Sequence, residues 1–153
     1  MRLLSLTRPE LIFLDLPGSD SPTVLQSLAT RVAEIEGLGD AQEIYRRILE
    51  REQLASTGIG AGVAIPHCKL AQLREPILTI GITREPIDFA AIDGAPVQLF
   101  LLILSPEEPP AAHLKALSTV SRWIKEASPA PALLAASDVQ DILSILEAAA
   151  AEE

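Results

Sequence analysis

Hydrophobic residues recur every three or four positions in four stretches of the chain, which is typical of amphipathic helices that cover a core with one face. The first predicted helix begins at Asp20 or Ser21 and ends at Gly37, because these residue types favour helix starts and stops. The second begins at Asp40, with Glu43 at the spacing of a capping box. The predicted helices span residues 21–36, 40–53, 111–127 and 139–150.

Short, nearly continuous apolar runs predict strands. The clearest covers residues 97–104, as expected of a strand with both faces covered. A second strand is predicted over 77–83, followed by a loop over 86–96, and a short strand leads into Pro66. Residues 11–16 are expected to form an edge strand or an extended entry segment. Helices before, between and after strands indicate an α/β sandwich, with one sheet flanked by helices on both faces.

The overall composition indicates one soluble domain spanning residues 1–153. Twelve basic residues against 21 acidic residues give a net charge of −9, which argues against a nucleic-acid partner. The longest apolar run of strand type, Leu99–Leu104, is far shorter than the ~20 residues of a membrane span, so no membrane insertion is expected. A lone cysteine, Cys68, gives no sign of an oxidising compartment. We therefore expect a cytoplasmic protein.

The segment 56–67 differs from the rest of the chain in its glycine content. Gly58, Gly60 and Gly62 fall within five residues, which predicts a loop whose backbone turns sharply or approaches a ligand. The surrounding window 41–84 carries six basic and four acidic residues, so it is positive within an acidic protein. This distribution suggests an anion near the loop, although most of these charges are expected to lie on solvated helix faces.

The two histidines are the main candidates for chemistry. His67 follows Pro66, which cannot donate to a strand ladder, so the strand is expected to end there and leave His67 at the rim of the sheet. A neutral imidazole can accept a phosphoryl group, and loop amides can bind the oxygens of that group. His113 lies in the first turn of a predicted helix, where the dipole favours an anion and a neutral ring. Taken singly, either histidine is more often structural.

The segment 51–70, Arg-Glu-Gln-Leu-Ala-Ser-Thr-Gly-Ile-Gly-Ala-Gly-Val-Ala-Ile-Pro-His-Cys-Lys-Leu, resembles the signature of a known family. It is similar to the type-2 enzyme IIA domains of the phosphoenolpyruvate-dependent phosphotransferase system, the fructose, mannitol and nitrogen-regulatory group. Later segments resemble the same family in order: Ile87-Asp88-Phe89, Asp93-Gly94, Pro96-Val97, residues 99–104 and His113-Leu114. The resemblance implies a mixed sheet flanked by helices on both faces.

The resemblance also implies a function and a site. His67 would accept a phosphoryl group from the small histidine phosphocarrier protein and pass it to an enzyme IIB component of a sugar transporter. Alternatively, a stand-alone protein of this kind would regulate target proteins according to its phosphorylation state. His113 and Arg51 match the family's other site positions. The phosphate-binding loop would comprise Thr57, Gly58, Gly60 and Gly62, and neither a cofactor nor a metal is implied.

Other kinds of site fit the sequence less well. His67, Cys68 and His113 could ligate a metal, but neighbouring residues of an extended chain point to opposite faces, and zinc needs three or four converging ligands. A cysteine hydrolase using Cys68 and His113 would lack an orienting third group. The glycine-rich segment also lacks the Lys-Ser/Thr ending of a nucleotide-binding P-loop. Cys68 itself departs from the glycine that is common at this position in the family.

Overall fold

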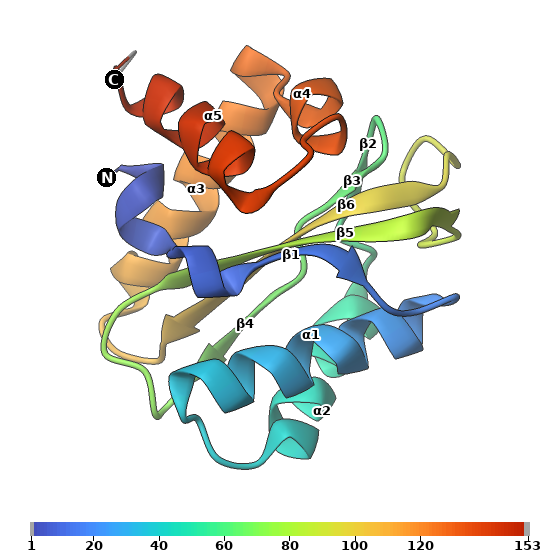
Figure 1. Cartoon of the computed structure of the whole chain (residues 1–153). Helices are drawn as coiled ribbons and strands as arrows, with labels where there is room; N and C mark the ends of the chain where they lie inside the picture. Colours follow the sequence, from blue (N-terminus) through green and yellow to red (C-terminus); the bar gives the residue numbers. More distant parts are fainter. Residues whose placement is uncertain (1, 152–153) are drawn as a thin grey trace.

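A mixed sheet with helices on both faces forms the framework of the protein. The computed structural model describes residues 2–151, which form six strands, five α-helices and two short 3₁₀ turns (Figure 1). The strands are β1 (Ile12–Leu16), β2 (Gly58–Gly60), β3 (Val63–Ala64), β4 (His67–Leu70), β5 (Ile77–Ile87) and β6 (Val97–Pro106). The helices are α1 (Ser21–Glu36), α2 (Ala41–Leu54), α3 (Pro110–Ala127), α4 (Ala130–Leu134) and α5 (Val139–Ala151); the turns are η1 (Leu3–Leu6) and η2 (Pro9–Leu11).

Strand β6 lies at the centre of the sheet. It pairs antiparallel with β5 on one side and parallel with both β3 and β4 on the other. Beyond these neighbours, β1 is parallel to β5 and β2 is antiparallel to β3, so the order is β1-β5-β6-β3-β2 with β4 beside β6. All residues of β6 are buried except Gln98, which explains its almost continuous apolar sequence.

Successive residues of β6 supply two separate cores. Phe100, Leu102 and Leu104 pack with residues of α1 and α2, whereas Leu99, Leu101 and Ile103 pack with residues of α3, α5 and η1. This alternation follows from the two-residue period of a strand. Figure 1 shows the same arrangement, with α1 and α2 below the sheet and α3, α5 and the N-terminal segment above it. The predicted fold class is therefore confirmed.

The starts of α1 and α2 and the end of α1 follow the sequence signals with one exception. Asp20 caps α1, where its side chain accepts from the Thr23 amide, and Gly37 ends the helix in the left-handed conformation with φ of 62°. Asp40 caps α2, but its side chain accepts from the Gln42 amide at 2.9 Å. The expected reciprocal contact of Glu43 is not formed, because the Glu43 carboxylate binds the guanidinium groups of the next turn instead.

Between residues 56 and 87, the structure differs from the predicted elements at three places. Part of the predicted loop forms the β2–β3 hairpin. The strand that leads into Pro66 ends before it, as expected, but a further strand that was not predicted, β4, begins directly after it. The Pro66 carbonyl accepts from the Ile103 amide at 2.9 Å, so the proline loses only its own donor and β4 continues beside β6. Strand β5 also extends to Ile87, because its pairing with β6 resumes after an irregular stretch that contains Pro86.

Candidate functional site

Strand β4 presents His67 at an edge of the sheet. Within residues 2–151, β4 pairs only with β6, so its other side is open. His67 is the first residue of β4 and is half-buried. The next residue, Cys68, points to the opposite face and packs into the core between the sheet and helices α1 and α2. The edge position therefore gives the imidazole one protein-lined side and one accessible side.

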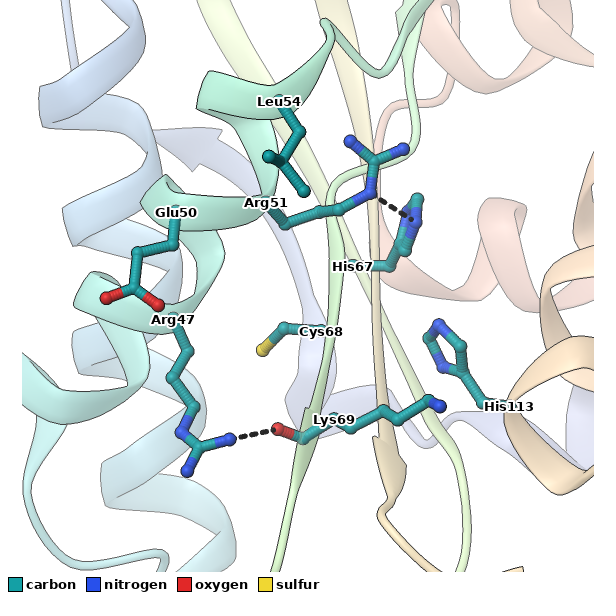
Figure 2. A pocket seen from close by; sticks show the side chains of 8 residues that line it. All are labelled: Arg47, Glu50, Arg51, Leu54, His67, Cys68, Lys69 and His113. Atoms are coloured by element: carbon teal, nitrogen blue, oxygen red, sulfur yellow. Dashed lines mark hydrogen bonds between the residues drawn. The ribbon is translucent and has the colours of Figure 1, made fainter. Parts of the chain in front are cut away.

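Two hydrogen bonds fix the tautomer of His67. The Arg51 Nε–H donates to Nε2 of the ring at 3.1 Å, so Nε2 carries the lone pair. The ring proton is consequently on Nδ1, which donates to the Ile65 carbonyl at 2.8 Å. Arg51 comes from the last turn of α2, where its Nη1 donates to the Ala55 carbonyl at 3.0 Å. The arrangement leaves Nε2 as the nucleophilic nitrogen and places a guanidinium beside it (Figure 2).

His113 approaches the same point from the first turn of α3. The centroids of the two imidazole rings are 5.4 Å apart, with an angle of 45° between the ring planes. Nδ1 of His113 is buried and has no hydrogen-bond partner in the described part of the chain. The predicted placement in a first helical turn is correct, and the three residues His67, His113 and Arg51 are brought together.

Both imidazoles are held in the neutral form. Burial lowers the pKa of His67, and the positive charge of Arg51 acts in the same direction, whereas the hydrogen bond to Ile65 opposes them. Burial lowers the pKa of His113 to about 4, assisted by His67, Lys69 and Arg51. A neutral His67 can act as a nucleophile, and a neutral His113 can donate one hydrogen bond to an anion.

The rings border a pocket of about 510 Å³ between the end of α2 and the start of α3. Its lining residues are Arg47, Glu50, Arg51, Leu54, His67, Cys68, Lys69 and His113 (Figure 2). Three of these side chains are cations and one is a carboxylate. Such a pocket favours an anionic ligand, in agreement with the positive window of the sequence.

The four predicted loop residues lie elsewhere. Thr57, Gly58, Gly60 and Gly62 are outside the set of described residues that line this pocket. The Thr57 amide and hydroxyl both donate to the Glu52 carboxylate, and the Gly58 amide donates to the Ser56 hydroxyl at 3.1 Å.

Packing and turn geometry account for these glycines. A Cβ on Gly58 would lie 2.8 Å from the Cβ of Ala91, closer than such atoms approach. Gly60 and Gly62 have φ of 101° and 80°, which favour glycine in the hairpin turn. Their role in binding phosphate stays a prediction.

The chemistry of Cys68 is limited by burial, which raises the pKa of its thiol to about 12. The thiol therefore stays protonated near neutral pH and is a poor nucleophile. Among residues 2–151, no three histidine, cysteine, aspartate or glutamate side chains gather where they could hold a metal ion. No α-helix within that range is both long and apolar enough to cross a membrane.

Sequence reasoning missed Arg47, Glu50, Leu54 and Lys69 as pocket residues. Lys69 was within reach of such reasoning, because residues two apart on a strand share a face and Lys69 follows His67 by two. That signal depends on recognising β4. It was missed because no strand was predicted after Pro66.

Comparisons with known proteins agree with this fold. The family model described as phosphoenolpyruvate-dependent sugar phosphotransferase system, EIIA 2, matches residues 5–149. A nitrogen regulatory protein of Bradyrhizobium diazoefficiens is 38% identical over 146 residues, which cover 95% of each chain. A fructose-specific EIIA component of Haloferax volcanii is 31% identical over 142 residues, covering 93% of this chain and 92% of the relative.

Solved structures show the same architecture. The nitrogen regulatory protein IIA-Ntr of Neisseria meningitidis superimposes with a TM-score of 0.85 at 29% identity, covering 93% of this chain and 97% of the other. A complex of the mannitol enzyme IIA with phosphorylated enzyme IIB of Escherichia coli contains a chain of the same fold, with a TM-score of 0.74 at 16% identity. The match covers 94% of this chain and 99% of the other. Fold and sequence together define a phosphoryl-transfer component. The chain belongs to the EIIA 2 family of the phosphoenolpyruvate-dependent sugar phosphotransferase system.

Proposed function

We propose that the protein carries a phosphoryl group on Nε2 of His67. It receives the group from a histidine phosphocarrier protein and delivers it to an enzyme IIB component or uses it to control a target protein. The observation that carries the proposal is the fixed tautomer of His67, in which the Ile65 carbonyl holds the Nδ1 proton and Nε2 faces a cationic pocket. Family membership supports the same role.

The transfer balances without any cofactor. The Nε2 lone pair of His67 attacks phosphorus, a new N–P bond forms, and the N–P bond to the carrier's histidine breaks with its electron pair returning to that ring. The step needs no proton exchange because each ring bears a proton on its second nitrogen: Nδ1 of His67 keeps its proton, and the carrier's ring leaves as a neutral imidazole. Onward transfer is the same step in reverse toward the next acceptor. Catalysis then consists of positioning and of stabilising charge on the phosphoryl oxygens.

Arg51 and His113 would supply that charge stabilisation. The Arg51 guanidinium now donates to Nε2 and would turn to a phosphoryl oxygen once the N–P bond occupies the lone pair. Its planar fork can donate two parallel hydrogen bonds to one phosphoryl group. His113 remains neutral near pH 7 and would donate one further hydrogen bond across the 5.4 Å between ring centroids.

Intact mass measurement tests the assignment of His67. The protein is incubated with phosphoenolpyruvate, enzyme I and the phosphocarrier, and we expect one acid-labile phosphoryl group per chain. His67→Ala should carry none, whereas His113→Ala should still be phosphorylated but transfer the group onward more slowly. Phosphoryl label that persists on His67→Ala would place the acceptor on another residue.

A regulatory output is the second candidate function, and it uses the same phosphohistidine. It is favoured by 38% identity with a nitrogen regulatory protein along almost the full length of both chains. Transfer from the phosphorylated protein to a fructose-type IIB domain separates the two outputs. Rapid transfer to the IIB domain supports a role in transport. No transfer to the IIB domain, together with a target protein that binds only one of the two phosphorylation states, supports regulation.

A further inference from the structure

Lys69 is a cation of the pocket to which the family resemblance assigns no role. It lies two residues after His67 on β4, so both side chains leave the same face of the strand, about 7 Å apart along the chain. The parallel register with β6, His67 opposite Ile103 and Lys69 opposite Ser105, fixes this relation. Lys69 is exposed, and it lines the pocket together with both histidines.

The Lys69 ammonium extends toward His113. Figure 2 shows the side chain running from β4 to the neighbourhood of that ring. The positive charge of Lys69 is one of the causes that lower the pKa of His113, which is consistent with this proximity. The ammonium therefore ends beside His113, at the border of the pocket that both imidazoles line.

The cations around the pocket differ in how their charge is compensated. Arg47 is paired with Glu43 at 3.3 Å and with Glu107 at 3.2 Å. Arg51 and Lys69 take part in none of the ion pairs formed within residues 2–151. The pocket carboxylate, Glu50, is already bound by Arg46 at 2.7 Å. Two uncompensated positive charges thus face the position where a group of charge near −2 would be attached.

We propose that Lys69 is a phosphoryl-binding residue, whose ammonium contacts oxygens of the group on His67 and shifts the transfer equilibrium toward the phosphorylated form of this protein. The inference rests on the proposed function, because it requires the phosphoryl group to be on His67. Arg51 is anchored on the α2 side by the Ala55 carbonyl, and Lys69 approaches from the α3 side. The two cations would hold the group from opposite sides.

The equilibrium constant for exchange with the phosphocarrier tests this role. Purified phosphorylated carrier and this protein are mixed without enzyme I. Once the mixture no longer changes, intact mass measurement quantifies the carrier and this protein, each with and without the phosphoryl group. Dilution until the ratio no longer depends on concentration removes any contribution from the docked complex. The constant then reports the phosphoryl group on free His67, whereas docking contacts change only the rate.

The variants remove or keep the positive charge of the side chain at position 69. Lys69→Met should lower the equilibrium constant by roughly three- to tenfold, which lies between the values of an exposed ion pair and a charged hydrogen bond. Lys69→Arg should restore most of the loss. Lys125→Met is the matched control, because Lys125 is an exposed lysine in the last turn of α3, at the end opposite His113, and should leave the constant unchanged. Unfolding midpoints of all three should match that of the parent.

The outcomes separate the two proposals. An equilibrium constant of Lys69→Met equal to that of the parent overturns the role of Lys69, even if transfer becomes slower, because the residue would then act only in docking. An equal fall for Lys125→Met would also overturn it, since the effect would come from net charge. Phosphorylation of His67→Ala, by contrast, would contradict the proposed function, because that function requires His67 to be the acceptor.

Discussion

The neutral state of His113 should make the stability of the protein depend on pH in a defined direction. The folded pKa of His113 is about 4, whereas the unfolded chain has the ordinary value of 6.5. Between these values the unfolded chain binds a proton that the folded protein does not bind. The free energy of unfolding therefore falls as the pH is lowered through 6.5 toward 4, and is independent of this group above about pH 7.5.

The magnitude follows from the same two values. At 1.36 kcal/mol per pH unit, the whole interval corresponds to about 3.4 kcal/mol for a fully shielded ring. His113 is only half-buried, so water screens part of this effect. The accessible range also ends near pH 5.2, above the pI of 4.7, where the protein would lose solubility. We therefore expect a loss of about 1 to 1.5 kcal/mol between pH 7.5 and 5.2.

Urea unfolding of the parent and of His113→Gln at a series of pH values measures this term. Glutamine does not titrate, and His67 and the carboxylates are present in both proteins, so their contributions cancel in the difference. The stability of the parent relative to His113→Gln should decrease by the stated amount as the pH falls. A difference that stays constant within about 0.3 kcal/mol across the range would refute the depressed pKa and, with it, the neutral donor role of His113.

Two further predictions concern the site and its support. Arg51→Lys should slow phosphoryl transfer from the carrier by about tenfold or more, because an ammonium cannot reproduce the two parallel hydrogen bonds of the guanidinium. Rapid-quench kinetics measure the rate, with Arg46→Lys as the control, and an unaltered rate would exclude Arg51 from the site. Gly81→Val should destabilise the protein by about 1–3 kcal/mol in urea unfolding. A Cβ at this position would lie 2.7 Å from Cδ2 of Leu16 and 3.2 Å from Cδ2 of Leu28. Retention of full stability would show that α1 has room to move away from β5.

The parts of the fold that the sequence predicted well are those with a local physical signal. Asp20 and Gly37 mark the ends of α1 because each satisfies backbone groups within one turn. The apolar run of β6 predicted a strand because both of its faces are covered. In neither case does the signal depend on where distant segments lie.

The errors arose where pairing with a distant strand overrides local chemistry. Pro66 breaks a ladder only at its own nitrogen, and its carbonyl still bonds to Ile103, 37 residues later in the chain. Gly58 is required by the approach of Ala91, which no local pattern reveals. Likewise, the resemblance to a family, and not the spacing of residues, brought Arg51 and His67 into one predicted site, since contact across 16 residues depends on how α2 packs against β4.

The break between β3 and β4 gives a physical reason for the position of His67, the proposed nucleophile. An imidazole that accepts a phosphoryl group must be buried enough to stay neutral and exposed enough to meet another protein, and an edge strand satisfies both conditions. At this break the Ile65 carbonyl accepts from the His67 ring, while the Pro66 carbonyl bonds to Ile103 and keeps β4 in register. Pro66, which separates the two strands, thus lies between Ile65, whose carbonyl fixes the tautomer, and His67, whose ring is held in that tautomer. Because β4 is held by β6 on one side only, the orientation of His67 depends on that pairing and on the inward packing of Cys68 and Leu70.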